Sequence, residues 1–552
     1  MDQATPGGTM RHGPRLVTIA VWSTFAVACF ASLREVPGAD PKPAAAKTKA
    51  TASSELTAVI DKTFEDAWAK ANVRPAPSAD DAEFVRRVYL DLVGKIPRVY
   101  ETLAFLDDPA PTAEKRAKLV EMLLESPAYL SRATETYRAM LLPEAETDAQ
   151  VRNVLPTFEA WLRKKVVDNA GYDKIVREVL TVSLGGRGRR AGNALDPRAS
   201  PSPLAFYIAK DAKPENLAAS ASRLFLGVRM ECAQCHNHPF SHWKREEFWG
   251  LAVFFGGVTR QGGNQAFGQI RENESPREMV IPGTTRVARA ALPGEAETKW
   301  RRGASGREVL ADWITAPDNP YFARAAVNRV WARFFGVGLV EPVDDLRDEN
   351  PSAHPELHDR LAREFREHGY DLKYLIRAIT ASKPYGLTSA VGRSELAPPQ
   401  LFAAMPLRSL SPDQLFDSLS QATGLGTTGQ DMIGGDARSR FSELFANRDE
   451  KSTEGQVSIL QALSLMNGPL ITSATSPETG NTLAAVVDSP FLDTAGKIES
   501  LYLSALSRRP RADESAAMTA FVQQGKSESD RAKALGDVFW ALLNSPEFRF
   551  NH

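Results

Sequence analysis

The stretch HPELHDRLAREFREHGYDLKYLIRAIT, residues 354–380, carries the pattern that decides the fold. Its large apolar residues recur three and four positions apart, which is the spacing of one face of an α-helix. The stretch AEKRAKLVEMLLESPAYL, residues 113–130, has the same spacing. Long alternations of apolar and polar residues, which would indicate exposed strands, are scarce. We therefore predict a mainly α-helical protein.

Two segments, one near each end of the chain, have similar sequences. Residues 89–129 and 502–548 each begin with Tyr-Leu, have a proline eight positions after the tyrosine, and end with Ser-Pro-x-aromatic. Proline disfavours helix in the residue before it. Each copy is therefore predicted to be a helix that stops near the first proline, a second amphipathic helix, and a third that ends at Ser-Pro.

The helical pattern is interrupted between residues 259 and 299. This segment is rich in Gly, Gln and Glu, and it contains two short stretches with apolar residues, EMVIPG (278–283) and TRVARAAL (285–292). It is typical of an irregular linker with short strands. The 552-residue length allows more than one domain. We predict two helical domains, residues 56–258 and 300–552, with this linker between them.

The composition excludes some classes of protein. The net charge is −1, with 24% charged and 43% hydrophobic residues, which is ordinary for a globular protein. Because there is no basic excess, we expect no nucleic-acid partner. Three cysteines cannot form a disulfide framework.

Residues 1–34 are predicted to be a signal peptide or a membrane anchor. Residues 16–33, LVTIAVWSTFAVACFASL, are uncharged and follow Arg11 and Arg15. A positive flank before an apolar run is typical of an export signal. Cys29, after small residues, also resembles a lipoprotein processing site, so a lipidated Cys29 is a further possibility. We expect an exported protein that is periplasmic, or membrane-anchored and facing outside the cytoplasm.

Residues 35–55 are predicted to be a disordered tether. They are rich in Ala, Lys, Pro, Thr and Ser, and Val36 is their one large apolar residue. Such a segment cannot bury enough apolar surface to offset its loss of conformational entropy.

The main candidate for a functional site is MECAQCHNHPFSHW, residues 230–243. In a C-x-x-C-H motif two thiols can form thioethers to haem, and the adjacent imidazole can bind the iron. We predict that Cys232 and Cys235 bind haem c covalently and that His236 is the proximal ligand. The corresponding function is an envelope haem protein, either an electron carrier or the redox partner of an unidentified enzyme.

Two other interpretations of the same residues stay open. Cys232, Cys235 and His236, with His238 and His242, could bind zinc or copper. Alternatively, the two cysteines could form a disulfide. In either case the protein would be a non-haem scaffold or binding protein. The nearby aromatic residues could form the wall of a hydrophobic cofactor site, but most of them are predicted to be helix core; they are Phe240, Trp243, Phe248, Trp249, Phe254 and Phe255.

The second half contains two weaker candidates. His354 and His358 are spaced for metal binding on a helix, but Pro355 between them favours a helix start. Arg329 with Asp344 or Asp345 is predicted to form a buried, structural ion pair. No nucleotide-binding or hydrolase motif is present, so catalytic residues cannot be assigned and enzymatic activity stays undecided.

Several longer stretches carry a family resemblance. FVRRVYLDLVGKIP (84–97), LESPAY (124–129) and FLGVRMECAQCHNHPFSHWKREEFWGLAVFF (225–255) resemble a cytochrome-like domain of unknown function that is common in planctomycete bacteria. The second half resembles the usual companion of that domain, also of unknown function. The stretches that carry this second resemblance are LADWITAPDNPYFARAAVNRVWARFFGVGLVEPVDD (310–345), SAHPELHDRLAREF (352–365), LQALSLMNGPL (460–470) and LLNSPEFRFNH (542–552). The resemblance implies a cytochrome-like protein but no particular reaction.

Overall fold

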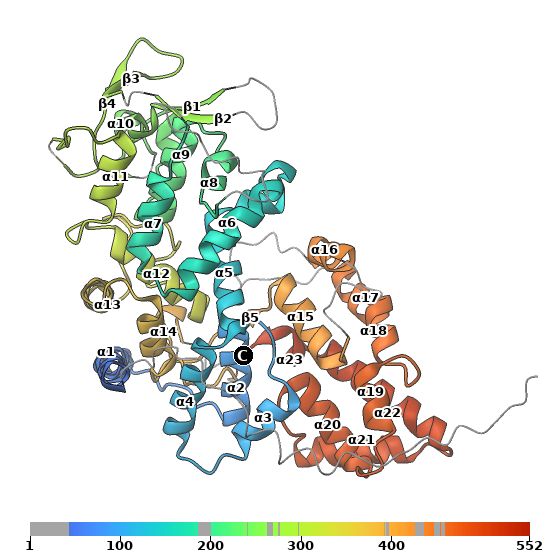
Figure 1. Cartoon of the computed structure of the whole chain (residues 1–552). Helices are drawn as coiled ribbons and strands as arrows, with labels where there is room; N and C mark the ends of the chain where they lie inside the picture. Colours follow the sequence, from blue (N-terminus) through green and yellow to red (C-terminus); the bar gives the residue numbers. More distant parts are fainter. Residues whose placement is uncertain are drawn as a thin grey trace, which may run out of the picture. The chain divides into compact units, whose positions relative to one another are not determined.

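The computed structural model describes eleven stretches of the chain. They are residues 43–185, 200–239, 241–261, 269–273, 276–295, 297–390, 392, 397–425, 435–445, 453 and 459–552. Helices dominate this described part (Figure 1), which confirms the predicted mainly α-helical class. Residues 51–552 form one compact unit. The predicted export segment 16–33 and Cys29 lie outside the described residues.

Helices make up most of the described chain before the linker. In chain order they are α1 (Pro43–Ala71), α2 (Asp81–Leu92), α3 (Val99–Leu106), α4 (Thr112–Leu124), α5 (Pro127–Leu141), η1 (Pro143–Glu146), α6 (Ala149–Val167), α7 (Tyr172–Thr181), α8 (Ala205–Ala209), α9 (Pro214–Ala221), η2 (Ser222–Leu226), η3 (Glu231–Gln234), α10 (Arg245–Ala252) and η4 (Val253–Phe255). Of these, η1, η3 and η4 are 3₁₀-helices, and η2 is a π-helical turn.

Helix α1 includes the end of the predicted tether. Residues 43–55 have helical backbone. Alanine and lysine have high intrinsic helix propensity, and the segment is rich in both. The rest of the predicted tether lies outside the described residues.

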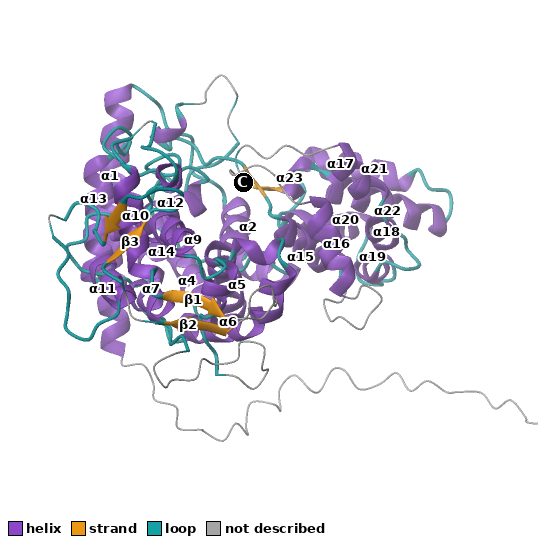
Figure 2. Cartoon of the chain, turned by 90° about the horizontal axis from the view of Figure 1, so that it is seen from above, coloured by secondary structure: helices purple, strands orange, loops and turns teal. Residues whose placement is uncertain are grey.

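Strands are short and scattered among the helices (Figure 2). In the predicted linker, β1 (Val258–Gln261) pairs with β2 (Gln269–Glu272), and β3 (Glu278–Val280) pairs with β4 (Val287–Arg289). Both pairs are antiparallel. The linker prediction of short strands is therefore confirmed.

The second half returns to helices. Its elements are α11 (Gly306–Ile314), α12 (Phe322–Phe335), α13 (Pro355–Glu367), α14 (Leu372–Thr380), η6 (Pro399–Leu401), β5 (Arg408–Ser409), α15 (Pro412–Thr423), α16 (Gly435–Phe445), α17 (Ile459–Asn467), α18 (Pro469–Ala474), α19 (Asn481–Val487), α20 (Thr494–Leu506), α21 (Ala512–Gln523), α22 (Glu528–Asn544), α23 (Pro546–Arg549) and β6 (Phe550–Asn551). The opening stretch 354–380 thus forms two helices, α13 and α14. They are separated at Gly369, whose φ of 65° lies in the left-handed region.

The similarity between the two segments near the chain ends is structural as well. In both copies three helices are followed by a fourth that starts at Ser-Pro: α2 to α5 in the first, and α20 to α23 in the second. Ser126 and Ser545 cap these last helices by accepting hydrogen bonds from the backbone N–H of Tyr129 and Phe548. The serine and the proline together fix the helix start, as expected for these residues.

Two large hydrophobic cores are present among the described residues, and they do not divide at the linker. The first core runs from Leu56 to Met405 and contains residues from both sides of the linker. The second core contains the C-terminal helices, shown in orange and red in Figure 1, together with Leu90 and Ile96 from the N-terminal half. In the sequence, the first core ends at Met405, and apart from Leu90 and Ile96 the second core begins at Leu410. Each core contains residues from both predicted domains.

A buried carboxylate on α2 forms hydrogen bonds with side chains from later segments of the chain. Asp91, on α2, accepts two hydrogen bonds from the Arg408 guanidinium, at 2.8 and 3.0 Å. It also accepts from the Tyr385 hydroxyl at 2.8 Å and from the Asn551 amide at 2.8 Å. All four side chains are buried. Burial, with the Asp91 carboxylate next in effect, raises the pKa of Tyr385, so its hydroxyl stays protonated and donates. We call this set of four residues the Asp91 cluster.

Two fully buried arginines on α2 strengthen the same connection. Arg86 donates to the backbone carbonyls of Ala505 and Phe548. Arg87 donates to the carbonyl of His552 and forms an ion pair with Glu83. Buried guanidinium groups need such partners because an unpaired buried charge is very costly. One face of α2 is therefore fixed to the C-terminal segment.

Replacing Asp91 by alanine should strongly destabilise the protein, because it leaves the Arg408 guanidinium buried without its counter-ion. We expect a loss of about 3–5 kcal/mol in the free energy of unfolding, measured by urea titration with far-UV circular dichroism. Asp359→Ala is the matched control, since Asp359 forms an exposed ion pair with Arg324 and should cost about 1 kcal/mol or less. Equal effects of the two substitutions would contradict a central role for Asp91.

Residues 51–260 should not fold on their own, although the linker begins near their end. Their share of the first core is completed by residues up to Met405. We expect this fragment to show no cooperative thermal transition by circular dichroism, while residues 51–552 show one under the same conditions. A sharp transition in the fragment would mean that the shared core is not needed for its stability.

Candidate functional site

The loop that holds the two cysteines follows a strained turn. The π-helical turn η2 ends at Gly227, whose φ of 66° favours glycine. A Cβ at this position would lie 2.9 Å from both Ala325 and Leu346. The Gly227 carbonyl also accepts a hydrogen bond from the Leu346 N–H. Glycine is therefore needed here, and it holds the start of the loop against the second half of the protein.

Buried residues hold the next turn, η3, in place. Met230 and Ala233 are fully buried. The carbonyl of Gln234 accepts hydrogen bonds from the Trp249 indole N–H at 3.0 Å and from the Arg245 Nε at 3.3 Å. Trp249, on α10, is itself in the core. The backbone of the C-x-x-C segment is thus fixed by α10.

The reactive side chains on this turn face outward. Cys232 and Cys235 are exposed free thiols, and His236 is exposed. The Nδ1 atom of His236 lies 2.7 Å from the carbonyl oxygen of Asn237. A carbonyl oxygen can only accept, so Nδ1 carries a proton and donates this hydrogen bond. The two thiols and the His236 imidazole are therefore exposed to solvent.

The two further histidines of the loop are placed differently. His238 is half-buried, and its backbone N–H donates to the Trp243 carbonyl. Burial, followed by the nearby Arg347 cation, lowers the pKa of His238. The His242 ring is exposed and lies 4.3 Å from the Trp243 ring, between centroids. Across the described residues, no three His, Cys, Asp or Glu side chains are grouped to hold a metal ion.

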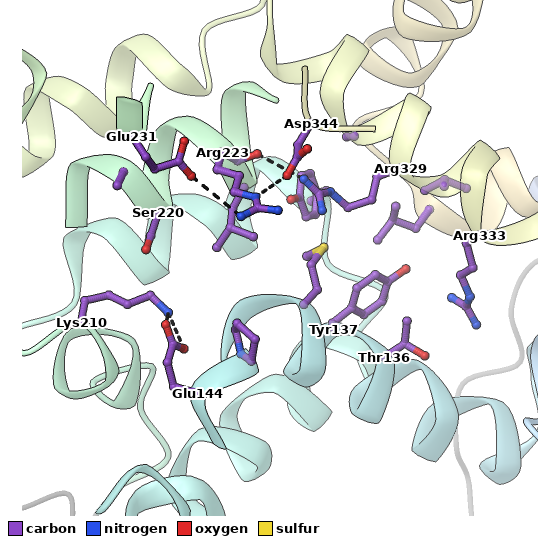
Figure 3. Close-up of a pocket in the computed structure, with 18 of the residues that line it drawn as sticks. Thr136, Tyr137, Glu144, Lys210, Ser220, Arg223, Glu231, Arg329, Arg333 and Asp344 are labelled. Carbon is purple, nitrogen blue, oxygen red and sulfur yellow. Dashed lines mark hydrogen bonds and ion pairs between the residues drawn. The ribbon is translucent and has the colours of Figure 1, made fainter. Parts of the chain in front are cut away.

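Two cavities flank the loop. The larger, about 560 Å³, receives Glu231 from η3, and its cationic side chains are Lys210, Arg223, Arg329 and Arg333. We call it the arginine pocket (Figure 3). The smaller, about 430 Å³, is lined by His242, Trp243 and His358 among others. Cys232, Cys235 and His236 line neither cavity.

Residues 59–260 match the family model PSCyt2, described as a protein of unknown function (DUF1549). Residues 306–456 match the model PSD1, described as a protein of unknown function (DUF1553). The chain is therefore similar to a DUF1549 domain followed by a DUF1553 domain. This order confirms the resemblance inferred from the sequence. No curated protein and no solved structure is significantly similar to the chain.

The DUF1549 domain contains the whole cysteine loop, and its aromatic residues are placed as predicted. Trp243, Phe248, Trp249, Phe254 and Phe255 are all buried in the first core. They are packing residues and do not form an open wall beside the thiols. Phe240 lies outside the described residues.

In the DUF1553 domain the helix-start interpretation of His354 is confirmed. His354 precedes Pro355, the first residue of α13. Its Nε2 lies 2.7 Å from the carbonyl of Gln400, whereas that of His358 lies 2.9 Å from the carbonyl of Arg324. The two rings thus bind different carbonyl groups and do not converge on one point.

The predicted ion pair between Arg329 and Asp344 or Asp345 is wrong. Asp344 pairs with Arg223 and with the Nε of Arg229 at 2.6 Å. Arg329 instead donates to the backbone carbonyl of Arg223. The π-helical turn brings Arg223 to Asp344, and this turn could not be read from hydrophobic spacing.

Sequence reasoning missed the arginine pocket because its residues come from separate segments. Arg329 and Arg333 are four positions apart, which places them on one helical face. This was the one visible signal. Lys210 and Arg223 come from the DUF1549 part, and no sequence pattern relates them to α12.

In protein produced without haem and kept reduced, Cys232 and Cys235 should react quickly with a maleimide dye in the native state, because both thiols are exposed. Intact-mass spectrometry should count two more dye groups on the native chain than on Cys232→Ser/Cys235→Ser. If these two thiols reacted only after denaturant was added, the exposed placement of the turn would be incorrect.

Proposed function

We propose that the DUF1549 domain binds haem c covalently through Cys232 and Cys235, with His236 as the proximal iron ligand. The protein would then serve as an envelope electron carrier or as the redox partner of an unidentified enzyme. The observation that carries this proposal is that Cys232, Cys235 and His236, on and directly after the anchored turn η3, are all exposed.

Exposure is informative because cysteine is usually buried when it only packs. Free cysteine is among the most buried residue types in folded proteins. Neither Cys232 nor Cys235 contributes to the core, whereas Met230 and Ala233, on the same turn, do. A packing role therefore does not explain the pair, and a chemical role does.

The donor set fits haem c. Haem supplies an iron centre that can change oxidation state, and two cysteines three positions apart are the usual attachment residues for its vinyl groups. The Nδ1–H of His236 donates to the Asn237 carbonyl, so Nε2 is the ring nitrogen that would bind the iron. Trp249 and Arg245 donate to the Gln234 carbonyl and so fix the backbone between the two thiols.

The family and the N-terminal segment support the same proposal. The name PSCyt2 of the matching model suggests a cytochrome-like family. The uncharged run 16–33 after two arginines suggests export, and we propose a periplasmic or membrane-anchored protein. Among the described residues no helix is both long and apolar enough to cross a membrane; residues 16–33 are not among them.

Covalent haem can be tested by producing the protein in a host with the cytochrome c maturation machinery. We expect a band with haem peroxidase activity on a denaturing gel, because thioether-linked haem survives denaturation. Intact mass should increase by one haem. Cys232→Ser/Cys235→Ser should lose the band and the mass increase.

Two histidine variants make this test specific. His236→Ala should lower haem incorporation or shift the Soret band, because it removes the proximal ligand. His242→Ala is the matched control, since His242 is an exposed histidine of the same loop, and it should behave like the wild type. A protein without the band, whose Cys232 and Cys235 form a disulfide or bind zinc or copper instead, would favour the non-haem scaffold.

A further inference from the structure

The arginine pocket has a charge arrangement that the cysteine loop does not explain. Its three carboxylates are all engaged by cations. Glu144 pairs with Lys210 at 2.6 Å, while Asp344 is bound by Arg223, which also lies 3.9 Å from Glu231.

Two cations of the pocket have no carboxylate partner. Arg329 donates to the carbonyl of Arg223, and Arg333 donates to the carbonyl of Asp91. No ion pair of either residue is found within the described part of the chain. The buried Nε of Arg329 also has no hydrogen-bond partner there. Two like charges four residues apart on a helix repel each other. A bound anion would relieve this repulsion.

Hydroxyl donors lie across the pocket from these arginines. Figure 3 shows Arg329 and Arg333 entering from α12, with Tyr137 of α5 on the other side. Tyr172 also lines the pocket, whereas the Thr136 hydroxyl donates to the carbonyl of Arg132. Burial raises the pKa of Tyr137, and it raises that of Tyr172 to about 12, so both hydroxyls remain protonated donors. Oxyanions are commonly bound by arginine together with such donors.

Apart from Ser220, the rest of the lining is apolar. Met140, Leu224, Val330, Leu372 and Ile376 all contribute to it. A volume of about 560 Å³ is within the range for small-molecule sites. The pocket also borders the π-helical turn η2, which holds Arg223, and such turns occur frequently at functional sites.

We propose that the arginine pocket binds a small organic acid, with an apolar body against the aliphatic lining and its oxyanion on Arg329 and Arg333. The carboxylate, sulfonate or phosphate group of this ligand would balance the positive charges of Arg329 and Arg333, which the three acidic side chains of the pocket do not. This site is separate from the thiols, because neither Cys232 nor Cys235 lines the pocket.

A pair of dyes that differ in charge tests this assignment. Anilinonaphthalene sulfonate carries an apolar body and a sulfonate, and N-phenylnaphthylamine is its analogue without the anionic group. Fluorescence titration of the full chain should show saturable binding of the sulfonate at one site. Arg329→Gln/Arg333→Gln should weaken sulfonate binding by about tenfold or more and leave binding of the neutral dye unchanged.

Three further variants make the result decisive. Arg363→Gln removes an exposed arginine of α13 outside the pocket and should bind both dyes like the wild type. Ala219→Phe should reduce binding of both dyes, since Ala219 lines the pocket. Cys232→Ser/Cys235→Ser should bind both normally, which separates this site from the haem proposal. Equal sulfonate affinity in the wild type and in Arg329→Gln/Arg333→Gln would overturn the assignment, as would wild-type binding that does not saturate.

Discussion

The buried carboxylate of Asp91 is the interaction on which the arrangement of the helices depends. It lies on the second helix of the chain, and its three partners come from a loop after α14, from β5 and from β6. In the interior, a charge is tolerated only when its hydrogen-bonding capacity is filled by partners in good geometry. The Asp91 cluster meets this condition. The buried side chains of its four residues therefore have their hydrogen-bond partners only when all four segments are in place.

The same region connects the fold to the candidate sites. Arg333 donates to the backbone of Asp91 and also lines the arginine pocket. Asn328, on the same helix α12, is fully buried and binds the backbone of Val340 in both directions, as donor and as acceptor. Helix α12 is thus held by polar contacts along its length. The cysteine loop, in contrast, is fixed mainly by its backbone, and its reactive side chains are left in solvent.

The elements that could be predicted are those set by local rules. Helical spacing indicated α13 and α14, Ser-Pro indicated the starts of α5 and α23, and a small β element in the linker was expected from its composition. The C-x-x-C-H motif identified the turn whose thiols are exposed. These features depend on a few neighbouring residues, so one sequence is sufficient to find them.

The features that could not be predicted depend on distant partners. Nothing near Asp91 indicates that Arg408, 317 positions away, is its counter-ion. The partner of Asp344 was assigned incorrectly because a π-helical turn reorients Arg223. The extent of the first core was missed for a related reason, since the linker interrupts the helical pattern without interrupting the packing. In each case tertiary structure, and not local preference, decides the outcome.

The separation between Asp91 and Asn551 also determines how the chain can reach its native state. These residues are 460 positions apart, and contacts between such distant residues slow folding because a long loop must close first. At typical translation rates, roughly half a minute passes between synthesis of α2 and synthesis of β6. During that interval Arg86, Arg87 and Asp91 have no C-terminal partners, and apolar residues of both cores are exposed. The contacts of Arg86, Arg87 and Asp91 with the C-terminal segments can therefore form only after nearly the whole chain has been synthesised.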